Sequence, residues 1–215
     1  MNCGALLDDL QQYISSAIQH GEFLLTTNRF SLAWMDDFHH DEHAQDVLRG
    51  ILMSFCANYL AHHDGTYVLG SLEQYNPLNP HASTAILLTQ NVVRDLNHPR
   101  LQFHKALVDP DSFEVLLDEV PEDSKLFLFV LPSVPHDLLI AASRNLAMMG
   151  HGVAGMLTPV ECEHLNGLEL RNALGLDFIP FMVYDSTAER ISSILEKSEP
   201  LYAQYHRYFQ TDEEC

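Results

Sequence analysis

The sequence predicts an α/β fold, in which a small parallel or mixed sheet of at least three strands is flanked by helices and follows a mainly helical N-terminal part. Three observations lead to this prediction. Residues 125–131, 152–157 and 178–184 are apolar runs of strand length, as expected for strands that are buried on both faces. Helical patterns separate the runs, and such alternation is typical of a sheet wrapped by helices. Two long amphipathic stripes precede them, and a mixed α+β arrangement remains open.

Both N-terminal stripes have the spacing of helices. Apolar residues recur on one side of residues 3–20, and Gly21 ends the pattern. A second stripe runs through residues 41–62 and includes Cys56, which we expect to be a buried thiol. We therefore predict two helices that each bury one apolar face.

Shorter elements connect these helices to the rest of the chain. Apolar residues alternate within residues 22–35, which predicts a hairpin, and residues 66–72 have the character of a strand. Residues 75–80 are a loop by composition. Ser83 is a candidate cap for a helix that ends near Leu96.

Further helices are expected between and after the three apolar runs. They are predicted over residues 111–120, 133–149 and 159–174, and from 186 onward past Pro200. With them, helices separate all three predicted strands.

A length of 215 residues suits one domain rather than two. Within that domain, residues 1–75 form the mainly helical N-terminal part and residues 81–210 form the α/β part. Residues 211–215 are expected to be a disordered acidic tail.

The charge of the chain restricts its partners. Lys and Arg total 11 and Asp and Glu total 30, which gives a net charge of −19. Such a chain repels phosphate backbones and anionic lipids, so binding to nucleic acid or to a membrane surface is disfavoured. It attracts basic partners, although acidity can equally serve solubility alone.

The four cysteines predict a reducing compartment. None forms a C-x-x-C pair, and Cys3 and Cys215 lie near the ends of the chain, where we expect exposed side chains. No basic stretch followed by an apolar segment opens the sequence, and no apolar run approaches the roughly 20 residues that span a bilayer. The prediction is a cytoplasmic protein without direct membrane insertion.

Histidines cluster at both ends of the second predicted helix. His39 and His43 are four residues apart, so on a helix they face one side and could share a metal ion. The pair His63 and Asp64 resembles the His-Asp dyad of HD-type metal phosphohydrolases, which would imply a metal-dependent hydrolase. A helix of about 20 residues is roughly 30 Å long, so a straight one keeps the clusters apart. Solvated helix termini explain the same residues, and no cofactor is predicted.

One strand-to-helix junction carries candidate catalytic residues. Ser133, His136 and Asp137 follow an apolar run and open a predicted helix, where α/β enzymes often place working residues. The same residues fit an ordinary helix start with a capping serine. The sequence has no G-x-S-x-G elbow, P-loop or G-x-G-x-x-G fingerprint, and few basic residues to hold an anionic cofactor. Nucleophilic catalysis and nucleotide chemistry are therefore disfavoured.

These observations predict an accessory protein that binds another, more basic protein. Small acidic adaptors and chaperones of bacterial secretion systems share this composition. The alternative is a small hydrolase-type enzyme on the α/β half, metal-dependent if the histidine clusters bind an ion. The predicted contacts are apolar and aromatic residues of the first and last helices: Leu6, Leu10, Tyr13, Ile14, Tyr202 and Tyr205.

Overall fold

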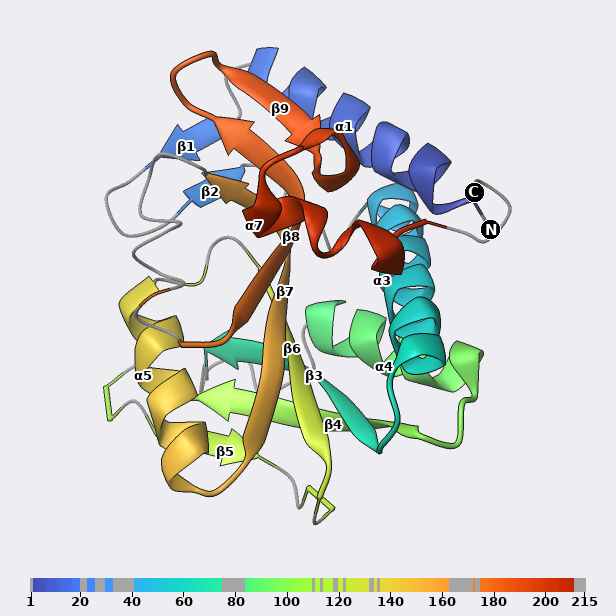
Figure 1. The fold of residues 1–215 in the computed structure, drawn as a ribbon. Helices are drawn as coiled ribbons and strands as arrows, with labels where there is room; N and C mark the ends of the chain where they lie inside the picture. Colours follow the sequence, from blue (N-terminus) through green and yellow to red (C-terminus); the bar gives the residue numbers. More distant parts are fainter. Residues whose placement is uncertain are drawn as a thin grey trace.

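A seven-stranded mixed sheet forms the centre of the molecule (Figure 1). The five strands β4, β3, β6, β7 and β8 run parallel, whereas the two edge strands run antiparallel to their neighbours. The predicted α/β class is confirmed, and the three apolar runs are neighbouring strands. In order across the sheet, the strands are β5 (Val115–Leu117), β4 (Leu101–Val108), β3 (Tyr67–Gln74), β6 (Lys125–Val130), β7 (Gly152–Cys162), β8 (Asp177–Asp185) and β9 (Arg190–Ser193).

The structure is a computed structural model, and only part of the chain is described below. The described residues are 2–19, 23–25, 30–32, 41–74, 84–109, 111–112, 114–117, 120–121, 123–131, 134, 136–162, 172 and 175–210. The predicted loop at 75–80 and the predicted tail at 211–215 lie outside this set.

Helices cover both faces of the sheet (Figure 1). No helix in the described ranges is long and apolar enough to cross a membrane. Among the described residues, the helices longer than ten residues divide between the two faces. On one face lie α1 (Cys3–Gln19), α3 (Glu42–His62) and α4 (Thr84–Leu96), and on the other lies α5 (His136–Met148).

A small separate hairpin follows α1. It consists of β1 (Phe23–Leu25) and β2 (Phe30–Leu32), which pair antiparallel. The hairpin and the two N-terminal helices agree with the sequence prediction. Helix α3 begins after Asp41, whose carboxylate accepts a hydrogen bond from the Ala44 N–H at 2.9 Å, as expected of an N-cap.

Strand β6 shows why its sequence is continuously apolar. Phe127 and Phe129 lie in the cluster with α1, α3 and α4, whereas Leu126, Leu128 and Val130 lie in the cluster with α5. All five side chains are buried. Both faces of the strand therefore require apolar residues, and the alternation typical of a half-exposed strand is absent.

Helix α1 buries its apolar stripe against α3. Cys3 is fully buried, so the expectation that it is exposed is wrong; the helix already begins at this residue and turns it toward the core. Cys56 is buried as predicted, and burial raises the pKa of its thiol to about 12. The Cys56 thiol forms no disulfide bond.

The predicted helix at 111–120 is wrong, because the chain turns back there and forms β5. The Asp109 carboxylate accepts hydrogen bonds from the backbone N–H groups of Asp111 and Ser112 at 2.9 and 2.8 Å, which closes a turn. These bonds lower the pKa of Asp109. β5 then pairs with β4, a strand that the sequence analysis did not identify.

Strand β7 is longer than its apolar core. It continues to Cys162, so the predicted helix at 159–174 is wrong over residues 159–162. Residues 163–171 lie outside the described part of the chain. The additional residues of β7 pair with β8 as far as Cys162, which lies opposite Tyr184.

The predicted helix from 186 onward is also wrong at its start. The Asp185 carboxylate accepts hydrogen bonds from the N–H groups of Thr187 and Ala188 at 2.8 and 3.1 Å, and this turn returns the chain as β9. Only short helical turns follow: η2 (Ile194–Glu196), α7 (Pro200–Ala203) and η3 (His206–Tyr208).

The C-terminal end of α3 is held by side chains from other segments. The Arg100 guanidinium donates hydrogen bonds to the carbonyl oxygens of Leu60 and His63, groups that the helix itself leaves unpaired. The His63 Nε2 lies 2.8 Å from the Tyr208 hydroxyl oxygen, and the His63 ring stacks on Tyr59. These contacts tie η3 to α3.

The buried position of Phe129 gives a direct test of the fold. Its side chain is 0% exposed and lies 6.4 Å from the Phe181 ring, measured between ring centres. Phe129→Ala should lower the free energy of unfolding by about 3–5 kcal/mol in urea denaturation, because it leaves a cavity. The control Leu87→Ala removes a side chain that is 47% exposed and should cost less than about 1 kcal/mol. Equal losses for the two variants would contradict this sheet.

The partly buried position of His63 predicts acid sensitivity. Burial, followed by the nearby Arg207, lowers the pKa of His63 below its ordinary value of 6.5. The folded state therefore binds fewer protons at this site than the unfolded chain, and stability should fall as pH drops below about 6.5. Urea denaturation between pH 7.5 and 5 measures the loss. His63→Gln should remove part of this pH dependence, whereas the exposed control His43→Gln should keep it; an unchanged slope in His63→Gln would refute the assignment.

Candidate functional site

The order of the strands reverses between β3 and β6. From β3 the sheet grows through β4 to β5, and from β6 it grows in the opposite direction through β7 and β8 to β9. In sheets of this kind, ligands bind in the crevice outside the carboxyl ends of the strands at such a switch point. The carboxyl ends of β3 and β6 therefore define the candidate site.

Helix α5 follows β6, so its N-terminus belongs to the same edge of the sheet. It has 13 residues and begins at His136. The first N–H groups of a helix have no partner within it and carry a partial positive charge, which makes a helix N-terminus suitable for anions. The exposed Asp137 already places a carboxylate there, with its Oδ1 accepting a hydrogen bond from the Leu138 N–H at 3.0 Å.

Buried polar side chains occur on the neighbouring strands. Ser71 on β3 and Thr158 and Glu161 on β7 are 1%, 2% and 5% exposed. Among the described residues, Glu161 is the only buried side chain of the charged types, and it lies one position before the carboxyl end of β7. The sequence analysis missed Glu161 because it placed a helix there; the apolar run continuing to Val160 was the signal for a longer strand.

The junction that the sequence singled out does lie at this edge. His136 is the first residue of α5 and Asp137 is in its first turn. Ser133 lies outside the described residues. The structure therefore places the backbone of His136 and Asp137 beside the switch point, and a catalytic role for the three residues stays a prediction.

The predicted metal ligands lie at opposite ends of α3. His43 is in its first turn, and its ring lies tilted against the ring of Tyr13, with 5.3 Å between ring centres. His63 follows its last residue and contacts Tyr208, and Asp64 is exposed beside it. His39 lies outside the described residues. Within the described chain, no group of three His, Cys, Asp or Glu residues is arranged to hold a metal ion.

The predicted protein-contact residues are core residues. Leu10, Ile14, Tyr202 and Tyr205 are at most 4% exposed. Leu6 packs against the same core, and Tyr13 is half-buried. An amphipathic stripe has the same spacing whether it covers the protein's own core or a partner, and here it covers the core. Leu10, Ile14, Tyr202 and Tyr205 therefore offer no apolar face to another protein.

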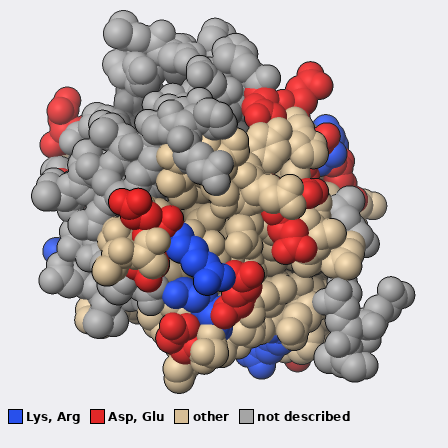
Figure 2. All heavy atoms as spheres, turned by 90° about the horizontal axis from the view of Figure 1, so that it is seen from above, with Lys and Arg blue, Asp and Glu red and all other residues tan. Residues whose placement is uncertain are grey.

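Acidic groups are spread over the surface near α1 and β9. Figure 2 shows this face from above, with acidic side chains dispersed over it and the largest basic group flanked by acidic ones. The Arg190 guanidinium lies 3.8 Å from the Glu196 carboxylate. An anion approaching this face meets negative charge, so the face suits a cation better than a phosphate.

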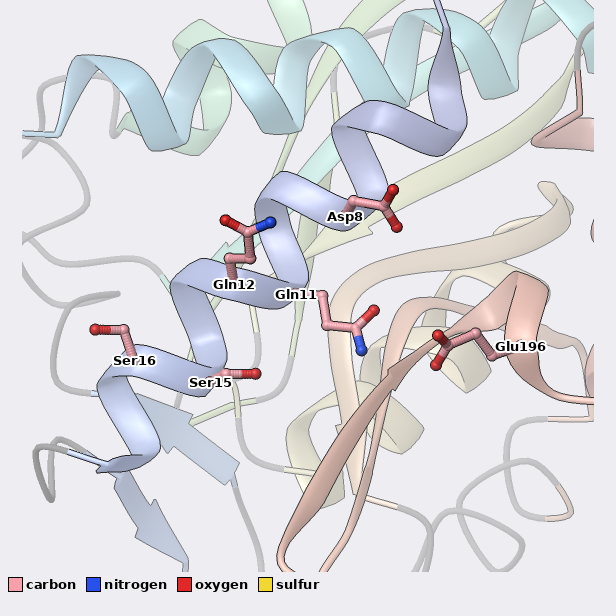
Figure 3. Close-up of a pocket in the computed structure, with 6 residues that line it drawn as sticks. All are labelled: Asp8, Gln11, Gln12, Ser15, Ser16 and Glu196. Carbon is pink, nitrogen blue, oxygen red and sulfur yellow. The ribbon is translucent and has the colours of Figure 1, made fainter.

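A polar groove of about 470 Å³ lies between α1 and η2 on this side (Figure 3). The Gln11 amide nitrogen donates a hydrogen bond to the Ile191 carbonyl oxygen at 3.2 Å and so links α1 to β9. Carboxylates on both walls make this groove unsuitable for phosphate. Its lining residues are Asp8, Gln11, Gln12, Ser15, Ser16 and Glu196.

Solved structures with a similar fold are phosphoribosyltransferases. The adenine phosphoribosyltransferase of Saccharomyces cerevisiae, complexed with D-2,5-dideoxy-2,5-imino-altritol 1,6-bisphosphate and adenine, aligns with a TM-score of 0.50 at 11% identity, covering 77% of this chain and 98% of that chain. The orotate phosphoribosyltransferase of Francisella tularensis aligns with a TM-score of 0.49 at 9% identity, covering 92% of this chain and 96% of that chain. The orotate phosphoribosyltransferase of Mycobacterium tuberculosis H37Rv, in complex with inorganic phosphate, aligns with a TM-score of 0.49 at 14% identity. This alignment covers 81% of this chain and 86% of that chain. No protein-family model matches the sequence, and no curated protein matches it.

The likeness to the yeast enzyme shows the fold of this chain, a phosphoribosyltransferase-like α/β sheet. It also corrects the sequence-based function. The solved structures named above are phosphoribosyltransferases, and this finding contradicts the prediction of an adaptor or chaperone-like factor and the hydrolase alternative. The burial of the predicted contact residues gives the physical reason for the first correction.

Proposed function

We propose that this chain is an enzyme that binds a phosphoribosyl compound at the carboxyl ends of β3 and β6 and transfers its phosphoribosyl group. The reversal of strand order at this edge carries the proposal, because it creates the crevice in which such sheets bind ligands. The yeast enzyme of similar fold is complexed with a bisphosphate and adenine. A phosphorylated sugar with a base as acceptor is therefore the substrate class we propose.

Backbone N–H groups at the start of α5 give this acidic chain a way to bind phosphate. Binding a phosphate through lysine or arginine is difficult for a protein with 11 basic and 30 acidic residues. A helix N-terminus holds phosphate through its own N–H groups and dipole, without basic side chains. We assign the phosphate to this end of α5.

We also propose a cytoplasmic location. The buried, unbridged thiol of Cys56 supports it, because such thiols persist in reducing compartments. An enzyme that uses soluble phosphorylated sugars fits the same compartment.

The proposal is tested by incubating the purified chain with phosphoribosyl diphosphate and a panel of acceptor bases that includes adenine and orotate. Chromatography should show a nucleotide that forms only when chain, donor and one acceptor are all present. Heat-denatured chain is the control. Absence of product with every acceptor, together with absence of donor binding by calorimetry, would overturn the proposal.

Removal of the Asp137 charge tests where the phosphate binds. Asp137→Asn should tighten binding of ribose 5-phosphate about two- to fivefold, because a charge at a helix terminus is worth about 0.3–1 kcal/mol. Isothermal titration calorimetry gives the dissociation constants. The matched control is Asp123→Asn, which removes the same charge before the amino end of β6. Asparagine tolerates the positive φ of 65° at that position. Equal changes in both variants would place the phosphate away from α5.

A further inference from the structure

An apolar patch lies at the β5 edge of the sheet. Four large hydrophobic side chains are exposed among the described residues, and two of them line this edge: Leu116 at 56% and Met149 at 48%. The third, Met148 at 79%, is the last residue of α5. The fourth, Leu87, is on α4. Single exposed apolar residues are ordinary, but a cluster of them marks a contact surface. Methionines adapt their shape to a partner more readily than branched side chains do.

The patch borders a groove of about 450 Å³. Its floor is continuous with the core on the α5 side of the sheet, because Val115 belongs to that core and Leu117 packs against it. An apolar side chain in the groove would therefore extend an existing hydrophobic cluster. The lining residues are Lys105, Leu107, Val115, Leu116, Leu117 and Met149.

β5 also offers backbone hydrogen-bonding groups. It is the last strand on its side of the sheet and pairs, within the described chain, with β4 alone. Proteins commonly protect such an edge with charged side chains or prolines. Here the exposed middle position of the strand is Leu116. None of the three residues of β5 is charged or a proline. An edge of this kind beside an apolar groove suits an extended peptide that adds as a further strand.

The acidic residues that precede β5 favour a bound segment that carries a basic residue. The turn that leads into β5 carries Asp109, Asp111 and Glu114, and hydrogen bonds from backbone N–H groups keep the Asp109 carboxyl ionised by lowering its pKa. A basic residue at one end of the bound segment would meet these carboxylates. A second copy of this chain would bring the same acidic turn and a net charge of −19, so like charges would oppose pairing of two β5 edges.

We propose that the β5 edge binds an extended segment of another protein by strand addition, with apolar residues at alternate positions and a lysine or arginine beside the acidic turn. Alternate side chains enter the groove over Val115 and Met149, and the backbone pairs with β5. Binding at the β5 edge does not depend on the chemistry at the switch point.

A random dodecapeptide phage library is the probe. Selection on the wild-type chain should enrich peptides that alternate apolar residues and carry Lys or Arg near one end. The most enriched peptide, made synthetically with a fluorescent label, should bind the Leu116→Lys variant at least tenfold more weakly in fluorescence polarisation. The control Leu87→Lys places the same charge on an exposed apolar residue elsewhere and should leave binding unchanged. Glu114→Lys should weaken binding of the basic peptide. This loss of affinity should be smaller for a peptide whose basic residue has been changed to Glu.

Several results would overturn the proposal. They are enrichment of peptides without the alternating or basic pattern, unchanged binding to Leu116→Lys, and equal losses in Leu116→Lys and Leu87→Lys. A dimer of the wild-type chain in sedimentation, dispersed by Leu116→Lys, would make a second copy the occupant and would also refute it. Circular dichroism of each variant shows whether a loss reflects unfolding; Leu116→Thr, which keeps β-propensity, then serves as the replacement and should weaken binding in the same direction.

Discussion

Strand β3 is confined on four sides, and the remaining structure is arranged around it. It pairs with β4 over its whole length and with β6 from Tyr67 to Leu72. Its side chains alternate between the two helical layers. At Gly70 the confinement leaves no room for a Cβ, which would lie 2.8 Å from the His104 carbonyl oxygen and 3.3 Å from the Leu128 side chain. Because β3 has a neighbouring strand on each side, the chain extends the sheet first through β4 and then, on the other side, through β6. This change of direction creates the switch point.

The acidity of the chain and the proposed ligand oppose each other. Long-range repulsion slows the approach of a phosphorylated sugar to a surface of net charge −19. At close range, the partial positive charge at the start of α5 acts over the first turn only. Binding then depends on backbone geometry at one edge of the sheet, and β6 fixes that geometry because both of its faces are packed. The protein can be acidic overall and still present one site suited to an anion.

The sequence predicted the elements whose patterns arise from local burial. β6, β7 and β8 were recognisable because both faces are covered, and α1 and α3 because each has one apolar stripe. β4 was missed because its residues Gln102, His104 and Lys105 are only partly covered or exposed, which gives the strand no clear period. β5 and β9 are short edge strands, and each follows a turn that is closed by hydrogen bonds to an aspartate carboxylate, Asp109 or Asp185. The switch point was not predictable, because it depends on pairing between strands far apart in the sequence. The backbone of His136 and Asp137 lies at the edge that the sequence predicted, because a strand followed by a helix is a local pattern.

Chemical-shift mapping with ribose 5-phosphate tests the central claim most directly. The account predicts that backbone amide signals move at the start of α5, at Asp137 and Leu138, and at the carboxyl ends of β3 and β6. Amides in the groove between α1 and β9, such as those of Gln11 and Ser15, should stay in place because that groove carries carboxylates on both walls. Shifts confined to that groove, or no shifts at saturating ligand, would contradict the assignment of the site to the carboxyl edge of the sheet.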